Sequence, residues 1–304
     1  MSASSVSVII PAYNAAATIE RAVESVVGQI GLREIIIVDD CSVDETVSVV
    51  HKLAGKIHFV KLVRHNVNCG ASETRNSGIA IAAGEYLAFL DADDIWLPGK
   101  LHKQLEHIVN RENVSLVTCD TLQLSPKGEV LKRGHSNRVP VSGCSAWKTL
   151  LSYNFIPTPT VLVRKRDVLS VGGFSRDLQV AEDLDLWIRI AMRGEVAVIP
   201  EVFVHYYDYS GSLMKSKGEK TEDIIMSMIK KHIRNNQQKL TVSEIRYIYG
   251  YRYYEFGLQR FFRNDPAGAM SFFTKAVKER FLVVKSLQYI LRAFFLCSIK
   301  RLTQ

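Results

Sequence analysis

Short apolar runs alternate with segments of helical periodicity over the first 120 residues. β-branched and other apolar residues make these runs nearly continuous, as they do in strands buried on both faces. These runs are residues 5–10, 34–38, 57–62 and 86–90. Between them, apolar residues recur three and four positions apart, as in amphipathic helices, at residues 16–27, from 44 onward and at 73–82. We therefore expect a mostly parallel α/β sheet covered on both faces, with a first strand that ends at Pro11 and ligands bound beyond the carboxyl ends of the strands.

The later part of the chain divides into a mixed and a helical region. The elements predicted in the mixed region are strands at 116–119, 160–163 and 196–199 and a helix at 184–192. Residues 207–220 are polar and aperiodic, which indicates a loop at a domain boundary. Beyond it the pattern is helical, and residues 257–276 have the spacing of one helix–turn–helix pair. We predict an α/β domain over residues 1–210 and an all-α extension over residues 211–304.

The positive charge of the chain is concentrated in this extension. The 304 residues include 39 Lys or Arg and 31 Asp or Glu, which gives a net charge of +8. Residues 1–210 hold 21 basic and 24 acidic side chains, whereas residues 211–304 hold 18 and 7, a net charge of +11. With 47% apolar and 23% charged residues, the composition is that of a globular protein and excludes a disordered chain. The partners of the extension should therefore differ from those of the α/β domain.

Cysteine usage and the chain termini bear on the cellular compartment. The five cysteines lie far apart and form no CxxC pair, which excludes a disulfide framework and a four-thiolate zinc site and indicates a reducing cytoplasm. No basic region precedes the first strand, so we expect no signal peptide. The apolar segment 281–297 contains Lys285 and Arg292, and it is too short and too charged to span a membrane.

Three acidic clusters stand where a strand ends or a helix begins. They are Asp39-Asp40, Asp91-Ala92-Asp93-Asp94, and Glu182-Asp183 with Asp185. In the first and third clusters an acid can simply cap the next helix, and this alternative stays open for each residue taken alone. For the second cluster the alternative is a solvated acidic turn, against which the flanking apolar residues argue. Alternate acids at a strand end can also bind Mg²⁺ or Mn²⁺, because hard cations prefer oxygen ligands.

Four spaced segments together resemble the family 2 glycosyltransferases. They are VSVIIPAYNAAATIERAVESV, EIIIVDDCSVDET, NVNCGASETRNSGIAIAAGEYLAFLDADD and VGGFSRDLQVAEDLDLWIRIAMRG, and Cys41 stands where a glycine is more usual. The resemblance implies the GT-A nucleotide-diphospho-sugar transferase fold, with a Rossmann-like sheet, ahead of the all-α extension. It also implies an inverting hexosyltransferase that moves a sugar from a nucleotide-diphosphate donor, expected to be a UDP-sugar, to an acceptor hydroxyl in the synthesis of cell-surface polysaccharide or glycolipid.

The resemblance further implies roles for individual residues. The loop that lines the nucleotide corresponds to Pro11, Ala12, Tyr13 and Asn14. Asp39 or Asp40 corresponds to the carboxylate that contacts the uracil or ribose, and Arg75 to the arginine of an Arg-Asn pair near the nucleotide. In the DxD motif Asp91-Ala92-Asp93, Asp93 is the expected ligand of Mn²⁺ or Mg²⁺, and Asp91 lies towards the ribose or the metal. Asp183 corresponds to the general base, and Glu73 departs from the small residue often found at its position.

Other interpretations remain open for parts of this site. His205 is either structural or a contact to metal or diphosphate, made when the loop 210–220 closes and Lys215 or Lys217 reaches phosphate. The alternative function is a non-catalytic sugar-nucleotide-binding subunit of a polysaccharide synthesis complex. The presence of all three expected acids, Asp39, Asp93 and Asp183, argues against a loss of catalysis. A nucleotidyltransferase or a dinucleotide-dependent oxidoreductase would need a glycine-rich loop after the first strand, where this chain has PAYNAAAT.

The basic extension contains many aromatic residues. Because these recur at helical intervals, we expect them to form the core of a helical hairpin rather than to bind nucleic acid. Its segment 281–302 places Leu287, Leu291, Phe294 and Phe295 near basic residues, as in a helix at an anionic membrane surface. A terminal helix packed on its own domain is the other interpretation. A helix at an anionic membrane surface would make the protein a peripheral enzyme at the cytoplasmic face of the membrane, acting on a glycan or lipid-linked acceptor.

Overall fold

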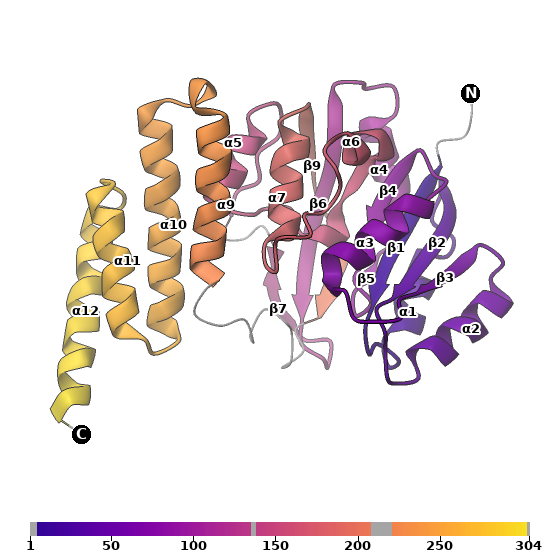
Figure 1. Cartoon of the computed structure of the whole chain (residues 1–304), viewed down its shortest axis with the longest axis horizontal. Coiled ribbons are helices and arrows are strands. Elements are labelled where there is room, and N and C mark those ends of the chain that lie inside the picture. The colour runs from indigo at the N-terminus through magenta and orange to yellow at the C-terminus, as the bar shows by residue number, and fades with distance from the viewer. Residues whose placement is uncertain (1–4, 135–137, 208–220, 303–304) are drawn as a thin grey trace. The chain divides into compact units, whose positions relative to one another are not determined.

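The computed structural model describes residues 5–134, 138–207 and 221–302, with the side chains of the last helix up to residue 296 (Figure 1). The chain forms two compact units, which comprise residues 1–147 with 155–216 and residues 148–154 with 217–304. The boundary that we predicted between residues 210 and 211 lies outside the described residues. The segment 148–154 groups with the C-terminal helices, and nothing in the sequence pattern indicated this.

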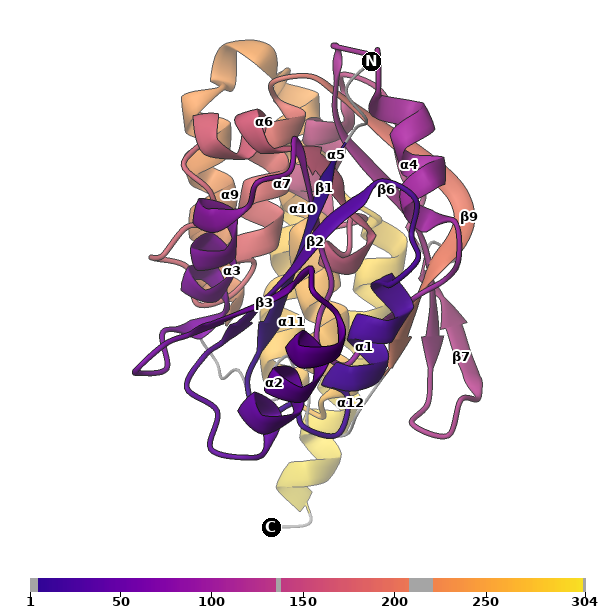
Figure 2. The ribbon, with the colours of Figure 1, turned by 90° about the vertical axis from the view of Figure 1, so that its right-hand side faces the viewer.

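Four parallel strands form one half of the sheet. In spatial order they are β3 (Val60–Arg64), β2 (Leu32–Asp39), β1 (Val6–Ala12) and β4 (Tyr86–Phe89). On one face lie α1 (Ile19–Val26) and α2 (Thr46–Lys56), and on the other lies α3 (Gly70–Ile81) (Figure 2). A Cβ atom added to Gly78 would come 2.6 Å from Ile9, so this glycine lets α3 lie close to β1. The prediction of parallel strands covered on both faces is confirmed.

Strand β1 continues past the expected end at Pro11. Pro11 pairs with Val38, and Ala12 pairs with Asp39. The pairing of β1 with β4 ends at Ile9 and Phe89, so the missing N–H of Pro11 removes no ladder bond on that side. The prediction that the strand stops at Pro11 was therefore wrong.

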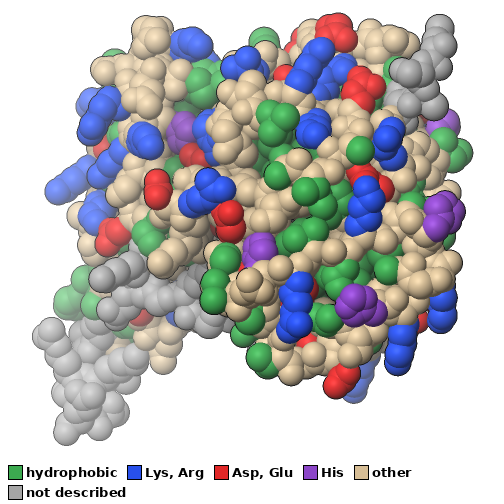
Figure 3. Space-filling view, turned by 45° about the vertical axis from the view of Figure 1, so that its right-hand side comes forward, with side chains coloured by type: hydrophobic (Ala, Val, Ile, Leu, Met, Phe, Trp, Pro, Cys, Tyr) green, Lys and Arg blue, Asp and Glu red, His purple; other side chains and the backbone are tan. Residues whose placement is uncertain are grey.

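The other half of the sheet is mixed. Strand β8 is antiparallel to β4, β6 lies between β8 and β9, and the short β5 pairs with the far side of β9. The strands are β5 (Ile95–Trp96), β6 (Val114–Leu124), β7 (Val130–Arg133), β8 (Leu162–Arg164) and β9 (Glu195–Tyr207). The helices are α4 (Lys100–Ile108), α5 (Ala146–Ser152), α6 (Lys165–Ser170) and α7 (Glu182–Ala191). Strand β9 extends well beyond the predicted 196–199. Acidic and basic side chains are interspersed on the face shown in Figure 3.

The second unit consists of helices that lie side by side (Figure 1). They are α9 (Thr221–Asn235), α10 (Val242–Phe262), α11 (Pro266–Lys278) and α12 (Val283–Leu302). A capping box of Thr241 and Glu244 begins α10, and Asp265 caps the start of α11. A Cβ atom on Gly257 would come 2.7 Å from Phe273, so α10 and α11 pack closely. The predicted helix–turn–helix pair is confirmed.

The aromatic residues of this unit only partly form its core. The rings of Tyr254 and Phe273 meet at 5.6 Å, and Phe256 is buried against the helix pair. Tyr247 and Phe262 are exposed instead, at 52% and 75% of their surface. No helix in the described part of the chain has the length and apolarity needed to cross a membrane.

Candidate active site

The carboxyl ends of β1, β2 and β4 lie at one edge of the sheet and carry most of the predicted site residues. Asn14 follows β1 with φ at 51°, a left-handed conformation that asparagine tolerates. Its N–H donates to Ser42 Oγ at 2.9 Å, and its Oδ1 accepts from the N–H of Val43 at 3.0 Å. Before it, Ala12 is buried and the Tyr13 side chain is half-exposed. The predicted nucleotide loop thus begins within β1, and Asn14 after the strand is held against the loop that follows β2.

Asp39 and Asp40 are both buried, but their carboxylates have different partners. Asp39 Oδ2 accepts from the N–H of Ser42 at 3.2 Å and forms an ion pair of 3.5 Å with Arg64, whereas its buried Oδ1 has no hydrogen-bond partner among the described residues. Asp40 accepts from the N–H groups of Cys69 and Gly70, both at 2.8 Å, on its two different oxygens. Asp40 thus satisfies backbone donors at the start of α3. One buried oxygen of Asp39 can therefore accept a hydrogen bond from a ligand.

His65 extends the network around Asp40. Its Nδ1 lies 2.8 Å from Asp40 Oδ1, and its Nε2 lies 2.9 Å from Ser77 Oγ. Asp40, His65 and Cys69 form a group of possible metal ligands, whose three ligand atoms lie within 4.8 Å of one another. It is the one such group in the described ranges. Because both ring nitrogens and both Asp40 oxygens already have hydrogen-bond partners, we interpret this group as a structural link between β2 and α3.

Arg75, a buried residue of α3, joins two acidic clusters that are far apart in the sequence. Its Nη2 donates to Asp91 Oδ1 at 2.9 Å, and its Nη1 donates to Glu182 Oε1 at 3.1 Å. Its guanidinium carbon lies 5.3 Å from the centre of the Phe174 ring. Burial alone would lower the pKa of Arg75, but the charges of Asp91 and Glu182 outweigh burial and raise this pKa. A permanent positive charge therefore holds the DxD motif next to the start of α7.

The next residue, Asn76, has a role that the sequence analysis missed. Its amide donates to the carbonyl oxygen of Phe174 at 2.8 Å and accepts from the N–H of Phe174 at 2.9 Å. Gly173 is required here, because a Cβ atom would lie 2.6 Å from Asn76 Oδ1 and φ is 71°. The Phe174 ring packs edge-on against Phe89 and Trp187, at 5.4 and 5.8 Å between centroids. The Arg-Asn pair and the Gly-Gly-Phe turn thus fix α3 against α7.

Burial and mutual repulsion act on the carboxyl groups of the acidic loop after β4. Burial first, and then the charge of Asp91, raises the pKa of Asp93. The same causes, together with Asp93, raise the pKa of the fully buried Asp94 well above its usual range. Asp94 accepts from the N–H of Tyr207 at 3.3 Å, but its Oδ2 has no hydrogen-bond partner in the described part of the chain. Arg21 donates to the carbonyl oxygen of Asp93 at 2.8 Å and fixes the loop backbone.

His205 lies on β9 close to this loop. It pairs across the sheet with Ile95 of β5, two positions after Asp93. Burial lowers the pKa of His205, which favours the neutral ring that can bind a cation or accept a hydrogen bond. Ala92, the middle residue of the DxD motif, packs into the hydrophobic core. The predicted contacts of Lys215 and Lys217 lie outside the described residues.

The three acids at the start of α7 have separate partners. Glu182 binds Arg75, whereas Asp185 forms an ion pair of 2.6 Å with Arg189. Asp183 is half-buried, and its Oδ1 accepts from the N–H of Leu184 at 2.7 Å. The N-cap residue of α7 is Ala181 and no side chain caps the helix, so the prediction that one of these acids is the N-cap was wrong. All three lie in the first turn, where negative charge stabilises the helix dipole, and the catalytic role of Asp183 stays a prediction.

Glu73, which stands where the family often has a small residue, forms an ion pair. Its carboxylate pairs with Arg176 of the segment between the Gly-Gly-Phe turn and α7, and the hydrogen bond from Arg176 lowers the pKa of Glu73. The pair adds a second, solvent-accessible link between α3 and the segment that leads to Asp183.

Comparisons with known proteins identify the family of the chain. The glycosyl transferase family 2 model matches residues 7–168, which is more than half of the chain. The putative teichuronic acid biosynthesis glycosyltransferase TuaG of Bacillus subtilis is 32% identical over 217 residues, which cover 70% of this chain and 82% of TuaG. The UDP-Glc:alpha-D-GlcNAc-diphosphoundecaprenol beta-1,3-glucosyltransferase WfaP of Escherichia coli is 31% identical over 214 residues, which cover 70% of this chain and 80% of WfaP. An uncharacterised glycosyltransferase of Haemophilus influenzae is 30% identical, and the chain spans 61% of its length.

A solved structure shares the fold. The crystal structure of S. aureus TarS 1–349 in complex with UDP-GlcNAc aligns with a TM-score of 0.67 at 18% identity, over 99% of this chain and 92% of that chain. The expected GT-A fold, with an α/β sheet ahead of C-terminal helices, is confirmed. The family match and the identity to relatives such as TuaG make the assignment direct. The chain belongs to glycosyl transferase family 2.

Proposed function

We propose that this chain transfers a sugar from a UDP-sugar to an acceptor hydroxyl, with inversion at the anomeric carbon and with the help of a divalent cation. The observation that carries the proposal is the bridge from Arg75 to both Asp91 and Glu182. It brings the DxD motif and the acidic cluster at the start of α7 together at the carboxyl edge of the sheet, where ligands of such sheets bind.

Asp39 is the residue that we assign to the nucleoside. Its buried Oδ1 has no donor among the described residues, and a buried unpaired carboxylate oxygen is costly unless a ligand donates to it. A uracil N–H or a ribose hydroxyl would supply such a donor. A UDP-sugar is further supported by the UDP-GlcNAc bound to TarS and by the UDP-Glc in the name of WfaP.

The acidic loop fits a divalent cation. Asp93 and Asp94 have raised pKa values because burial and neighbouring carboxylates disfavour their charged forms, which is the situation that a cation relieves. Carboxylate oxygens suit Mg²⁺ or Mn²⁺, and Asp93, with His205 nearby on β9, would hold the ion. When bound, the ion acts as a Lewis acid that stabilises the charge on the departing diphosphate.

Asp183 is the base that we assign to the acceptor. As the acceptor oxygen forms its bond to the anomeric carbon, the hydroxyl proton passes to the Asp183 carboxylate. The bond from the anomeric carbon to the diphosphate oxygen breaks on the opposite side, and its electron pair leaves with the diphosphate. Arg75 keeps the start of α7 in place beside the DxD motif during this step.

The acceptor that we propose is a glycan or a lipid-linked sugar, used in the synthesis of cell-surface polysaccharide or glycolipid at the cytoplasmic face of the membrane. The diphosphoundecaprenol acceptor in the name of WfaP supports a lipid-linked acceptor. The succinoglycan biosynthesis protein ExoO of Rhizobium meliloti, 30% identical over 219 residues, supports a polysaccharide product.

Calorimetric binding of UDP-, GDP- and dTDP-sugars, each with and without Mn²⁺, tests the donor assignment. We expect one class of UDP-sugar to bind, more tightly with Mn²⁺, and we expect Asp93→Ala to abolish the effect of the metal while Asp177→Ala, at an exposed position, retains it. Binding of none of these donors, or equal binding with and without metal, would contradict the proposal.

A further inference from the structure

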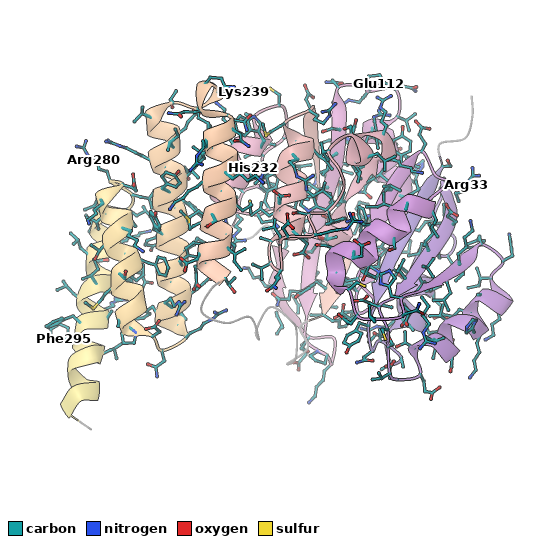
Figure 4. The ribbon with its side chains drawn as sticks, viewed as in Figure 1. Arg33, Glu112, His232, Lys239, Arg280 and Phe295 are labelled. Carbon is teal, nitrogen blue, oxygen red and sulfur yellow. The ribbon has the colours of Figure 1, made fainter. Side chains whose placement is uncertain are left out.

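We propose that α12 docks on an anionic lipid surface through an exposed apolar stripe. The stripe consists of Val284, Leu287, Leu291 and Phe295, whose side chains are between 47% and 70% exposed. Their spacing of three, four and four residues places them within about 80° of one another, at about 100° per residue. Phe295 projects outward from α12, away from α11 (Figure 4).

The stripe is distinct from the face by which α12 packs on its own unit. Ser286 and Ala293 are fully buried, and the Tyr289 ring stacks on Phe273 of α11 at 5.1 Å. These positions lie on the side of the helix opposite the stripe. Because α12 is already anchored by its buried face, the exposed apolar residues are not needed for that packing. A continuous row of exposed apolar residues is typical of an interaction surface.

The charge of the segment around α12 selects an anionic partner. Residues 280–304 contain five Lys or Arg and no Asp or Glu. Lys285 and Arg292 are exposed at one border of the stripe, where long basic side chains can reach lipid headgroups while the apolar residues enter the acyl boundary. Each basic side chain near such a surface adds to its attraction.

A second copy of the chain fits this surface less well than a lipid does. If the stripes of two copies packed on each other, Lys285 and Arg292 of one copy would lie near Lys285 and Arg292 of the other. Residues 280–304 hold no acidic side chain that could neutralise these positive charges. Like charges in such a contact weaken association. An anionic headgroup layer instead complements both features of the helix, its apolar stripe and its basic border.

This inference deepens the proposed function, because it rests on an acceptor that is found at the membrane. Its test, however, needs no enzymatic activity. The full chain is mixed with vesicles of phosphatidylcholine alone or of equimolar phosphatidylcholine and phosphatidylglycerol, and the bound fraction is measured by flotation. We expect binding to the anionic vesicles to exceed binding to the neutral ones about tenfold or more at low salt, and to fall as salt is added.

Leu291→Glu is the decisive variant. It places a charge in the stripe, so we expect binding to anionic vesicles to fall about tenfold or more while the thermal midpoint stays unchanged. Leu131→Glu on β7 is the matched control, since Leu131 is 52% exposed and Leu291 60%, and this variant should bind like the wild type.

Three results would overturn the inference. They are no binding of the full chain to anionic vesicles at low salt, an equal loss in both variants, and self-association that Leu291→Glu abolishes in sedimentation while vesicle binding is absent. If vesicle binding behaves as expected but no UDP-sugar binds, the proposed function fails and the docking surface stands.

Discussion

The guanidinium of Arg75 donates a hydrogen bond of 2.9 Å to the carboxylate of Asp91. The same group donates to Glu182 at 3.1 Å, so one buried charge couples the DxD motif to the helix that carries Asp183. Lysine cannot reproduce this geometry, because its three N–H donors share one nitrogen, whereas the planar guanidinium presents a donor nitrogen to each carboxylate. A neutral side chain lacks the charge.

Replacing Arg75 therefore tests the coupling. Arg75→Met leaves two partly buried carboxylates without their cation, and we expect a loss of about 2–5 kcal/mol in the free energy of unfolding. Arg75→Lys keeps the charge, so it should lose less stability and yet lose most of its activity, because donors on one nitrogen cannot hold both carboxylates at the positions that the guanidinium sets. Urea unfolding and initial rates measure the two effects. Full activity in Arg75→Lys would show that the bridge is not needed.

The adjacent Asp39 and Asp40 should give opposite phenotypes. Asp39→Asn keeps the contact with Ser42 and alters the buried oxygen that we assign to the nucleoside. We expect UDP affinity to fall about 10-fold to 100-fold, with little change in stability. Asp40→Asn weakens the bonds to Cys69 and Gly70, and we expect it to lose about 1–3 kcal/mol of stability. Calorimetry with UDP and urea unfolding of both variants measure this, and the reverse pattern would contradict the assignment.

Asp183→Asn should remove the general base and leave the helix start intact, since an asparagine oxygen can still accept from the N–H of Leu184. We expect the rate of sugar transfer to fall about 10²-fold to 10⁴-fold with donor affinity unchanged. Asp177→Asn, at an exposed position in the same segment, is the control that should keep full activity. If Asp183→Asn loses donor binding instead, Asp183 belongs to the donor site.

Lys100 gives the free energy of unfolding a specific pH dependence. Its side chain is fully buried, donates to Gln104 at 2.8 Å and lies 3.8 Å from the centre of the Trp96 ring. Burial lowers the pKa of Lys100 to about 8, from 10.5. Between about pH 8 and pH 10.5 the unfolded chain binds more protons than the folded chain. The free energy of unfolding should therefore rise with pH in this range, by up to about 1 kcal/mol per pH unit.

Cys119 acts in the opposite direction at higher pH. Burial raises the pKa of its thiol to about 11, from 9.0, so the unfolded chain loses this proton first and stability falls across that range. Unfolding should therefore be measured below about pH 9. Lys100→Met should remove the rise, and Lys103→Met, at a partly exposed lysine of the same helix, should keep it. Equal pH slopes in the wild type and Lys100→Met would contradict the prediction.

The parallel half of the sheet could be predicted because continuous apolar runs make up most of β1, β2 and β4. The mixed half could not be predicted in detail, since β8 has three residues and β9 alternates buried and half-exposed positions without a clear period. The continuation of β1 through Pro11 depended on where the pairing with β4 ends, which no local pattern shows.

The site was predictable in its residues and not in its contacts. Two consecutive aspartates stand at the end of the same strand, and only their partners in the fold separate Asp40, which binds the start of α3, from Asp39. The bonds of Asn76 to Phe174 join residues that are far apart in the sequence, and neither motif alone indicates the other. Metal binding and the base remain predictions, which activity measurements must test.

The most direct test of the central claim is release of free nucleoside diphosphate from UDP-, GDP- and dTDP-sugars, with and without Mn²⁺. Wild type is compared with Asp93→Ala and Asp183→Asn. We predict slow release from one UDP-sugar that requires the metal and is lost in both variants. Release that proceeds equally without metal and in Asp93→Ala, or a protein that neither turns over nor binds any of these donors, would contradict the account.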